Sequence, residues 1–373
     1  MSAPPSAALT AAADCGPTAI LDVHRDIVGA HILPRLDGAS LASAGCTSSQ
    51  LYSLSAQDHL WTAACLSNWP STAATPRLRG LIAAFPGGPR AFFAASFPLL
   101  LPTSASATIT SPPPEELISA VDIHYAGKLI FSKVLETETF TGWFRCSPFR
   151  IDLLDPKDAV PTAIRHPDSA SACCELAAEM TLSWVLIDPA GRRAANLSSH
   201  KPVAVERHWL TGEVQVRFST VLFGGDKKSP EVEWAVVVTC FGSEVGEMHV
   251  GEVSLLVEDM EGNHLSGKDG LIILHRAFEG KRGNKRRDVE ARKTYEGYLA
   301  RKRERREKKL KNESTLDMVC VASGYLFLFS FALYLQLTKQ NLFLLFFLLL
   351  FSKKILSITR QILKFFSSLF CKR

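Results

Sequence analysis

The sequence predicts an α+β protein with an N-terminal module of three helices, a β-rich sandwich-like domain, a basic helix and a hydrophobic C-terminal helix. Apolar residues recur at helical spacing before residue 70, alternate with polar residues in the middle of the chain, and continue without a charge through 318–337. Hydrophobic residues make up 47% of the 373, which is enough to build a buried core in at least one domain.

The first 19 residues are rich in Ala, Pro and Ser, and they lack a basic start and a long apolar stretch. They predict a disordered tail rather than a secretory signal. The nine cysteines include no CxxC pair and no Cys/His spacing typical of a zinc site. The sequence therefore predicts no metal site, and it favours a reducing compartment over a disulfide framework.

The segment 20–69 is expected to form the helical module. Ile27, Val28 and Ile32 follow a helical period that Pro34 interrupts. A second helix is expected over 39–54, with Asp37 or Ser40 as its N-cap, ending before the segment 58–61. The next segment, 70–114, is dense in proline and glycine, so it predicts a helical extension followed by a Pro-rich linker.

The segment 115–278 predicts the β-rich domain, because strand-like runs are separated there by turn signals such as Asp188-Pro-Ala-Gly191, Phe223-Gly-Gly-Asp226 and Glu261-Gly-Asn263. The alternation of apolar and polar residues is cleanest in Val214-Gln-Val-Arg-Phe218. Strands are expected at 129–134, 179–187, 213–222, 234–241, 249–257 and 271–274. Short antiparallel strands at this spacing indicate a sandwich or a jelly-roll-like domain.

The C-terminal part combines strong charge with strong hydrophobicity. Fifteen Lys and Arg residues lie in 281–311, although the net charge of the chain is only +5, and the Glu residues among them favour a solvated helix over 281–313. The apolar run 318–337 is about 30 Å long as a helix, which matches the hydrocarbon thickness of a bilayer. The tail 338–373 is hydrophobic and basic, and its apolar run 342–351 is too short to span, so it is expected to be interfacial or re-entrant.

This order of segments predicts a single-pass C-terminal anchor with the preceding chain on the cytoplasmic face of a membrane. A basic cluster directly before an apolar span is typical of a juxtamembrane segment, which favours membrane over nucleic acid as the partner. The alternatives are a buried or partner-covered helix, and a location in the nucleus or cytosol if the anchor is not inserted. The sequon at Asn196 would carry a glycan if the β-rich domain were lumenal.

Enzyme motifs are weak throughout the chain. Gly262-Asn-His-Leu-Ser-Gly-Lys268 fits a phosphate-binding loop, but Asp269 stands where that loop needs Ser or Thr, and a strand rather than a helix is expected to follow. No H-E-x-x-H or G-x-S-x-G motif is present. Trp184, Trp209 and Trp234 could line a ligand groove, although tryptophan in a sandwich is more often core. The sequence predicts neither catalysis nor a cofactor.

The N-terminal pattern resembles the F-box, a three-helix module that binds a Skp-type adaptor. The matching residues are Asp26-Ile-Val28, His31-Ile-Leu-Pro-Arg-Leu36, Leu41, Ala44, Cys46, Leu51, Asp58-His-Leu-Trp61 and Cys65. Cys65-Leu-Ser-Asn-Trp-Pro-Ser71, Phe85-Pro-Gly-Gly88, Trp184-Val-Leu-Ile-Asp-Pro189, His208-Trp-Leu-Thr-Gly-Glu-Val214 and 252–260 extend the resemblance to plant F-box proteins over the chain up to about residue 335. Val23-His24 and Ser49 depart from the Leu-Pro and Trp usual in the family, which predicts weaker adaptor binding.

The resemblance implies that apolar side chains of the module bind the adaptor. The expected adaptor-binding residues are Ile27, Val28, Ile32, Leu33, Pro34, Leu36, Leu41, Leu60 and Trp61. The implied function is that of a non-catalytic substrate receptor in a cullin-based ubiquitin ligase, with the β-rich domain presenting a target protein. The alternative is a membrane-anchored glycan- or peptide-binding protein whose N-terminal helices are purely structural.

Overall fold

A computed structural model describes the chain from residue 23 onward, except 102–111, 156, 225–229, 243–245, 281 and 284–286; within 339–373 it describes only 348, 351–352, 354–356, 358–361 and 363. The expectations for the tail 1–19, for the centre of the Pro-rich linker, for most of the tail 338–373 and for part of the turn 223–226 lie outside these residues. The chain divides into two compact units, Met1–Tyr298 and Leu299–Arg373.

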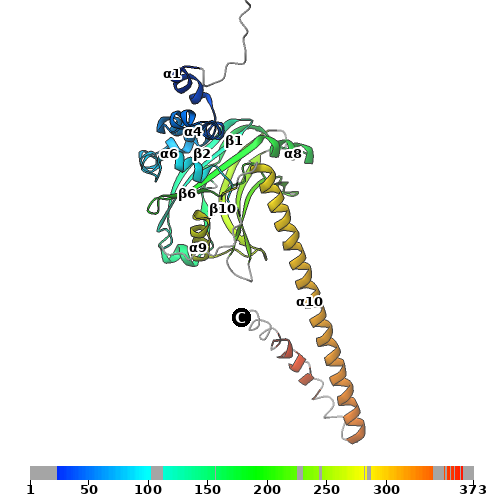
Figure 1. Cartoon of the computed structure of the whole chain (residues 1–373). Helices are drawn as coiled ribbons and strands as arrows, with labels where there is room; N and C mark the ends of the chain where they lie inside the picture. Colours follow the sequence, from blue (N-terminus) through cyan, green and yellow to red (C-terminus); the bar gives the residue numbers. More distant parts are fainter. Residues whose placement is uncertain are drawn as a thin grey trace, which may run out of the picture. The chain divides into compact units, whose positions relative to one another are not determined.

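Short helices make up the N-terminal part of the first unit (Figure 1). They are α1 (Arg25–Ile27), the π-helix η2 (Val28–Ile32), the 3₁₀-helix η3 (Leu33–Arg35), α2 (Gly38–Gly45), α3 (Ser49–Ser55), α4 (Asp58–Asn68), the 3₁₀-helix η4 (Pro70–Ala73), α5 (Pro76–Ala83) and α6 (Gly88–Ser96). The expected N-cap Asp37 is confirmed, since its carboxylate accepts a bond of 2.6 Å from the Ser40 N–H.

The single helix expected over 39–54 is wrong, because the structure divides this segment into α2 and α3. The hydroxyl of Ser48 accepts from the Leu51 N–H and starts a new helix there. Gly45 ends α2 at a point where a Cβ atom would come within 2.6 Å of the Ser55 hydroxyl. The turn between α2 and α3 therefore lets the two helices pack closely against each other.

Two antiparallel sheets form the β-rich part. A four-stranded sheet has the order β2-β1-β5-β6, and a six-stranded sheet has the order β3-β10-β9-β8-β7 with β4 paired to β10. The strands are β1 (Glu116–Tyr125), β2 (Lys128–Glu138), β3 (Arg150–Asp152), β4 (Val160–Arg165), β5 (Met180–Asp188), β6 (Arg193–Asn196), β7 (Ala204–Arg207), β8 (Val214–Phe223), β9 (Glu231–Gly242) and β10 (Glu247–Asp259). Helices α7 (Gly142–Cys146), α8 (Ala170–Glu179) and α9 (Gly267–Phe278) connect or follow them.

The strand expected at 271–274 is wrong, because these residues lie in α9. The Ser266 side chain caps this helix by accepting from the Asp269 N–H, and its hydroxyl donates to the Asp269 carboxylate over 2.7 Å. Four consecutive apolar residues fit a buried strand or a buried helix equally well. The cap at Ser266 and the helical spacing of Leu271, Leu274 and Phe278, all three of which are buried, are the features that distinguish the helix.

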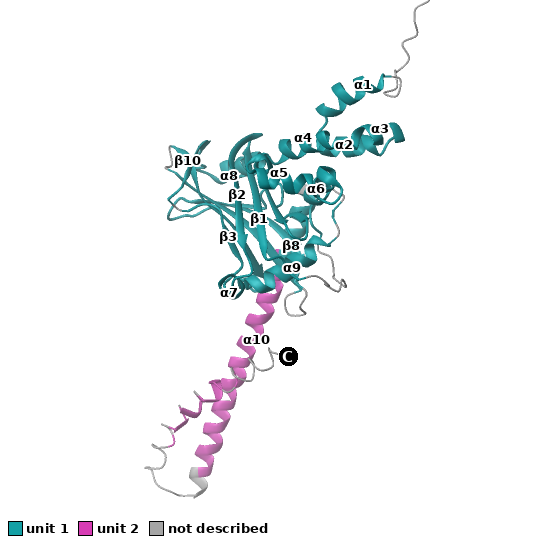
Figure 2. Ribbon diagram, turned by 90° about the vertical axis from the view of Figure 1, so that its left-hand side faces the viewer, with its two compact units in different colours: residues 1–298 teal, residues 299–373 magenta. Residues whose placement is uncertain are grey.

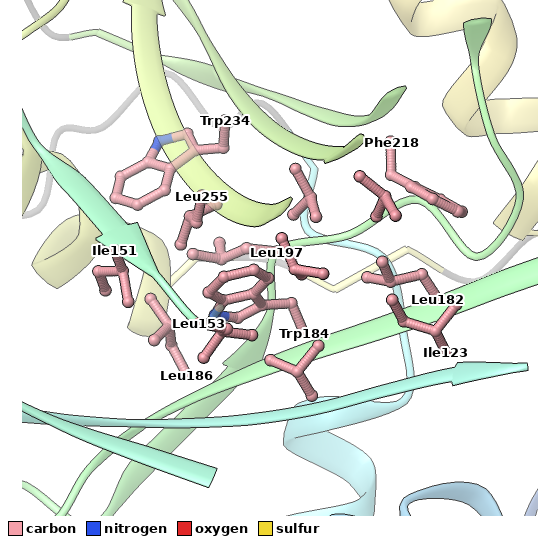
Figure 3. Packing of buried hydrophobic residues seen from close by; sticks show 14 of the residues in the cluster. Ile123, Ile151, Leu153, Leu182, Trp184, Leu186, Leu197, Phe218, Trp234 and Leu255 are labelled. Carbon is pink, nitrogen blue, oxygen red and sulfur yellow. The ribbon is translucent and has the colours of Figure 1, made fainter. Parts of the chain in front are cut away.

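The two sheets face each other across a shared hydrophobic core, which confirms the predicted sandwich-like α+β fold. Trp184 of β5 and Trp234 of β9 are fully buried in this core (Figure 3). The Trp184 indole N–H donates to the Ser119 hydroxyl on the neighbouring strand β1. Helix α9 contributes Leu271 and Leu274 to the same core.

The N-terminal helices cover the other face of the four-stranded sheet. Leu117 and Val121 of β1 belong to the core between the sheets, whereas Ile118 and Ala120, one position along, belong to a second core that they share with the helices. Phe92 and Phe93 of α6 are buried in this second core. The helical module and the sandwich are therefore packed together as one unit (Figures 1 and 2).

A buried carboxylate links the helices to the sheet. Asp122 of β1 accepts bonds from the Ser71 N–H over 2.9 Å, from the Ser71 hydroxyl over 2.5 Å and from the Ser132 hydroxyl over 2.7 Å. Burial raises the pKa of the Asp122 carboxyl, and these hydrogen bonds oppose the rise because they favour its charged form. Asp122 thus fixes the start of η4 against the centre of the sheet.

We expect Asp122→Ala to lower the free energy of unfolding by about 1–3 kcal/mol, because it leaves the buried Ser71 N–H without its acceptor. Urea unfolding followed by tryptophan fluorescence, in a chain ending at Lys311, measures the change. Ser132→Ala removes only one of the three bonds and should cost less. An unchanged midpoint for Asp122→Ala would contradict the role of this carboxylate.

Helix α10 (Arg287–Thr338) joins the basic run and the apolar run in one continuous element of 52 residues. At its start, within the first unit, Ala291, Tyr295 and Tyr298 are buried, and the Tyr298 hydroxyl donates to the Asp259 carbonyl. Further along, Lys308 and Glu304 form an i,i+4 ion pair of 2.7 Å, as expected for a solvated charged helix. Among the described residues α10 is the one helix long and apolar enough to cross a membrane, and none of its most apolar window is buried.

Candidate functional site

The apolar side chains of the N-terminal module are the first candidates for a binding site, and the structure separates them into two groups. Five of the nine residues expected to bind a partner lie in the core that the helices share with the sheet, each at most 3% exposed. They are Val28, Leu33, Leu41, Leu60 and Trp61. These side chains hold the module in shape, and their share in binding stays a prediction.

The other four residues are accessible. Ile27 is 49% exposed and Pro34 is exposed, whereas Ile32 and Leu36 are half-buried. All four lie in the segment from the last residue of α1 to the residue that follows η3. Because the π-helix η2 has i to i+5 bonds, Ile27 and Ile32 fall about one turn apart on the same side. We call these four residues the N-terminal apolar patch.

The buried residues of the module are held in place by a hydrogen bond and by close packing on α6. The Trp61 indole N–H donates to the Ser55 carbonyl over 2.6 Å, which joins α4 to the end of α3. The Trp61 ring packs against Phe93 of α6 with 5.4 Å between ring centroids. Gly38 lies so close to the Phe93 ring that a Cβ atom would come within 2.2 Å of it. The first residue of α2 is thus locked against α6.

Two exposed side chains of the module were missed by sequence reasoning. Tyr52 on α3 is exposed, with the Arg90 guanidinium 4.9 Å from its ring centroid, and Leu66 on α4 is 38% exposed. An apolar residue on the polar side of a short helix is the sequence signal that could have indicated them. They are accessible apolar side chains on α3 and α4, outside the N-terminal apolar patch.

Cys65 is a buried thiol in the core of this module. Burial raises the pKa of the Cys65 thiol to about 12, so it stays protonated near neutral pH and is not a nucleophile. Among the described residues of the whole chain, no three His, Cys, Asp or Glu side chains are grouped so that they could hold a metal ion. What the described residues of the module offer to a partner is apolar contact area, at the N-terminal apolar patch.

The loop that resembles a phosphate site is occupied by internal contacts. A helix does follow it, contrary to the sequence expectation, but Asp269 places a carboxylate at the start of α9. The Gly267 N–H donates to the Ser147 carbonyl over 2.8 Å, so this N–H group is not available to a phosphate. Gly267 also lies against the Phe144 backbone, where a Cβ atom would come within 2.0 Å of the carbonyl oxygen. The close packing against Phe144 explains why position 267 is a glycine.

The three tryptophans singled out in the β-rich part differ in exposure. Trp184 and Trp234 are core residues, as expected for a sandwich. Trp209, however, is 87% exposed, and its neighbour Leu210 is 70% exposed in the turn between β7 and β8. The N–H of Thr211 donates to the His208 imidazole and orders this turn. An apolar pair displayed on an ordered turn is a second candidate for protein recognition.

Comparison with known proteins gives three similar proteins of Arabidopsis thaliana. A probable F-box protein is 48% identical over 309 residues, which cover 82% of this chain and 90% of the relative. Two F-box proteins are 42% identical over 321 residues and 43% identical over 311 residues; they cover 82% and 79% of this chain, and 93% and 84% of the relatives. No family model matches the chain, and no solved structure matches it.

Proposed function

Since this chain belongs to the plant F-box proteins, we propose that it is the substrate receptor of an SCF-type ubiquitin ligase, binding a Skp-type adaptor through its N-terminal helices. A cullin-based ligase is recruited through that adaptor, and the β-rich part receives the target protein. The receptor then acts by proximity, because it raises the effective concentration of the target near the ubiquitin-carrying enzyme. This role needs no catalytic group in the chain.

The N-terminal apolar patch is the observation that carries the proposal. Ile27 and Pro34 stay accessible, and Ile32 and Leu36 partly so, although 14 hydrophobic residues of the helices between residues 28 and 93 are buried in the adjoining core. An adaptor surface that covers the patch would remove this apolar area from water, which is the main source of affinity when helices dock in a groove.

The packing of helices on the sheet supports a receptor function as well. The bond from Ser71 to Asp122 and the ion pair of Arg77 with Glu116 (2.7 Å) connect η4 and α5, which follow the module, to the four-stranded sheet. An adaptor on the patch and a target on the sandwich would therefore be held at a fixed distance. Fixed geometry favours transfer to particular lysines of the target.

We place the target contact at the β7–β8 turn. Trp209 and Leu210 are large, apolar and exposed, and tryptophan is over-represented among the residues that dominate binding energy at interfaces. The target is expected to offer an apolar pocket that takes the Trp209 ring.

Membrane attachment through 318–337 completes the proposal and puts the preceding chain on the cytoplasmic face. The exposed apolar side chains of this part of α10 support it, since Tyr325, Leu326 and Phe329 are each more than 60% exposed. The basic residues of 281–311 come before the apolar run, and each cation near an anionic leaflet contributes on the order of 1 kcal/mol.

Binding of a purified Skp-type adaptor to the full chain in detergent tests the function. We expect a stable complex on size exclusion, and ubiquitin transfer to captured proteins once the cullin-based ligase is added. Trp209→Ala with Leu210→Ser should keep the adaptor complex and lose captured targets. Failure of the wild-type chain to bind the adaptor would contradict the proposal and favour a membrane-anchored glycan- or peptide-binding protein.

A further inference from the structure

Arg282 lies where the end of α6 meets the sandwich. It follows α9 and is half-buried, and its guanidinium donates to five backbone carbonyl groups. The acceptors are Ala95 of α6 (3.1 Å), Ala194 of β6 (3.2 Å), Ala277 and Phe278 of α9 (2.9 and 3.1 Å) and Gly280 (3.0 Å). Every N–H group of the guanidinium is thus bound by a carbonyl group of the chain itself.

The backbone beside Arg282 is held at the same place. The Gly283 N–H donates to the Leu99 carbonyl over 2.8 Å, and Arg282 forms an antiparallel bridge with Leu100. Both leucines are buried. The chain that leaves α6 is therefore held against the chain that leaves α9, although Arg282 and Ala95 lie 187 positions apart in the sequence.

The position suits a cation with several donors. Ala95 lies in the last turn of α6, and Ala277 and Phe278 lie in the last turn of α9. Carbonyl groups at the C-terminal end of a helix carry the negative end of its dipole and lack the N–H partners of a continuing helix. Burial lowers the pKa of the Arg282 guanidinium, and the Glu279 carboxylate opposes this shift. Because the carbonyl groups come from three elements, a planar fork with five donors satisfies them better than an ammonium group would.

Helix α6 connects the N-terminal module to the sheet. On one side, its Phe93 packs against Trp61 of α4 and against the Gly38 backbone of α2. On the other side, α6 contacts β6, and its Phe92 lies in the core that the helices share with the sheet. The orientation of α2 and α4 relative to the sandwich therefore depends on α6, whose last turn is bound by Arg282.

We propose that Arg282 is a positioning residue for ubiquitin transfer, because it fixes the end of α6 on β6 and α9 and so sets the orientation of the N-terminal module on the sandwich. The inference rests on the proposed receptor function. A ligase modifies the lysines that its scaffold brings to the ubiquitin-carrying enzyme, so a change in this orientation alters transfer without altering either docking surface. Arg282 belongs neither to the N-terminal apolar patch nor to the β7–β8 turn, so its role can be separated from binding.

The distance between the N-terminal module and the sandwich tests this role. Cys46 at the end of α2 and Cys146 in α7 are free and exposed, so both can carry a spin label. In the full chain in detergent, Ser replaces Cys15, Cys174, Cys320 and Cys371, and the buried Cys65, Cys173 and Cys240 stay. We expect pulsed electron paramagnetic resonance to give a narrow Cys46–Cys146 distance distribution in this background. Arg282→Gln, which removes the charge and most of the donors, should broaden and shift it.

Two further variants separate positioning from stability. Arg282→Lys keeps the charge but not the fork, so its distribution should lie between those of the background and of Arg282→Gln. Leu153 is buried in the core between the two sheets, so Leu153→Ala should lower the melting temperature without broadening the distribution. A distribution that Arg282→Gln leaves unchanged, or that Leu153→Ala broadens equally, would overturn the proposal. If Arg282→Gln does not fold, Arg282→Lys compared with Leu153→Ala decides by the same criterion.

Ubiquitin transfer gives a second readout. With purified adaptor and cullin-based ligase, the lysines of the chain itself serve as the substrate, and mass spectrometry maps those that are modified. For Arg282→Gln we expect a lower maximal rate and a wider set of modified lysines, while the adaptor concentration at half-maximal rate stays that of wild type. A raised half-maximal concentration with the same lysines modified would assign Arg282 to docking and overturn the positioning role. Failure of the wild-type chain to bind the adaptor would overturn the receptor function instead, and the distance distribution would still decide whether Arg282 holds the module on the sandwich.

Discussion

Replacing Ile27 by Asp should lower the affinity for a Skp-type adaptor by about 10- to 100-fold, since a central apolar side chain at an interface contributes about 1–3 kcal/mol. The side chain is 49% exposed, so the free chain gains no buried charge. The melting temperature should therefore stay near that of wild type. Titration of the full chain with purified adaptor, followed by calorimetry, measures both quantities.

Leu66→Asp is the matched control for Ile27→Asp. Leu66 is an exposed leucine of the same module, but it lies on α4 outside the N-terminal apolar patch. We expect its effect on adaptor affinity to be smaller. Equal losses for Ile27→Asp and Leu66→Asp would extend the docking surface to α4, and no loss for Ile27→Asp would remove the patch from the interface.

Much of the fold follows from local sequence patterns. Val214-Gln-Val-Arg-Phe218 alternates between faces, and β8 begins at Val214. Asp37 has the side chain of an N-cap, and α2 begins directly after it. Such signals are local, so they do not depend on the partner against which an element packs.

How deeply each side chain is buried could not be predicted, because burial depends on the part of the chain that packs against it. Leu33 and Ile32 are neighbours in one apolar run, yet Leu33 is buried and Ile32 is half-exposed. The sequence does not say that α6 packs on the module, with Phe93 against Trp61 and the Gly38 backbone, and such contacts decide which face of a short helix is core. The same uncertainty applies to Trp209, which lies in an apolar-rich turn but has no covering layer.

Helix α9 shows a second limit. Leu271-Ile-Ile-Leu274 contains no polar residue that would fix its period, so the helix is distinguished from a strand by features outside this run, namely the cap at Ser266 and the helical spacing to Phe278. For 318–337 the pattern predicts a helix but does not say what surrounds it, because an apolar helix of this length can lie in a membrane or against a partner protein. The surroundings of an all-apolar segment come from packing and not from its own pattern.

Replacing Trp61 by Ala should destabilise the first unit by about 3–5 kcal/mol, as is typical for removal of a buried aromatic ring. The ring is 2% exposed, packs against Phe93, and donates from its indole N–H to the Ser55 carbonyl. In a chain ending at Lys311, we expect the melting temperature to fall by roughly 10 °C. Adaptor binding should be lost only as the module unfolds.

Two controls separate a core role of Trp61 from a direct role in docking. Trp61→Phe keeps a ring beside Phe93 but loses the bond to Ser55, so it should cost less than Trp61→Ala and retain adaptor binding at low temperature. Trp209→Ala removes the same side chain from an exposed turn, and the melting temperature should stay unchanged. If Trp61→Ala melted like wild type and still lost the adaptor, Trp61 would be a docking residue. Removal of a buried ring leaves a cavity that lowers stability. An unchanged melting temperature would therefore contradict the core position described for Trp61.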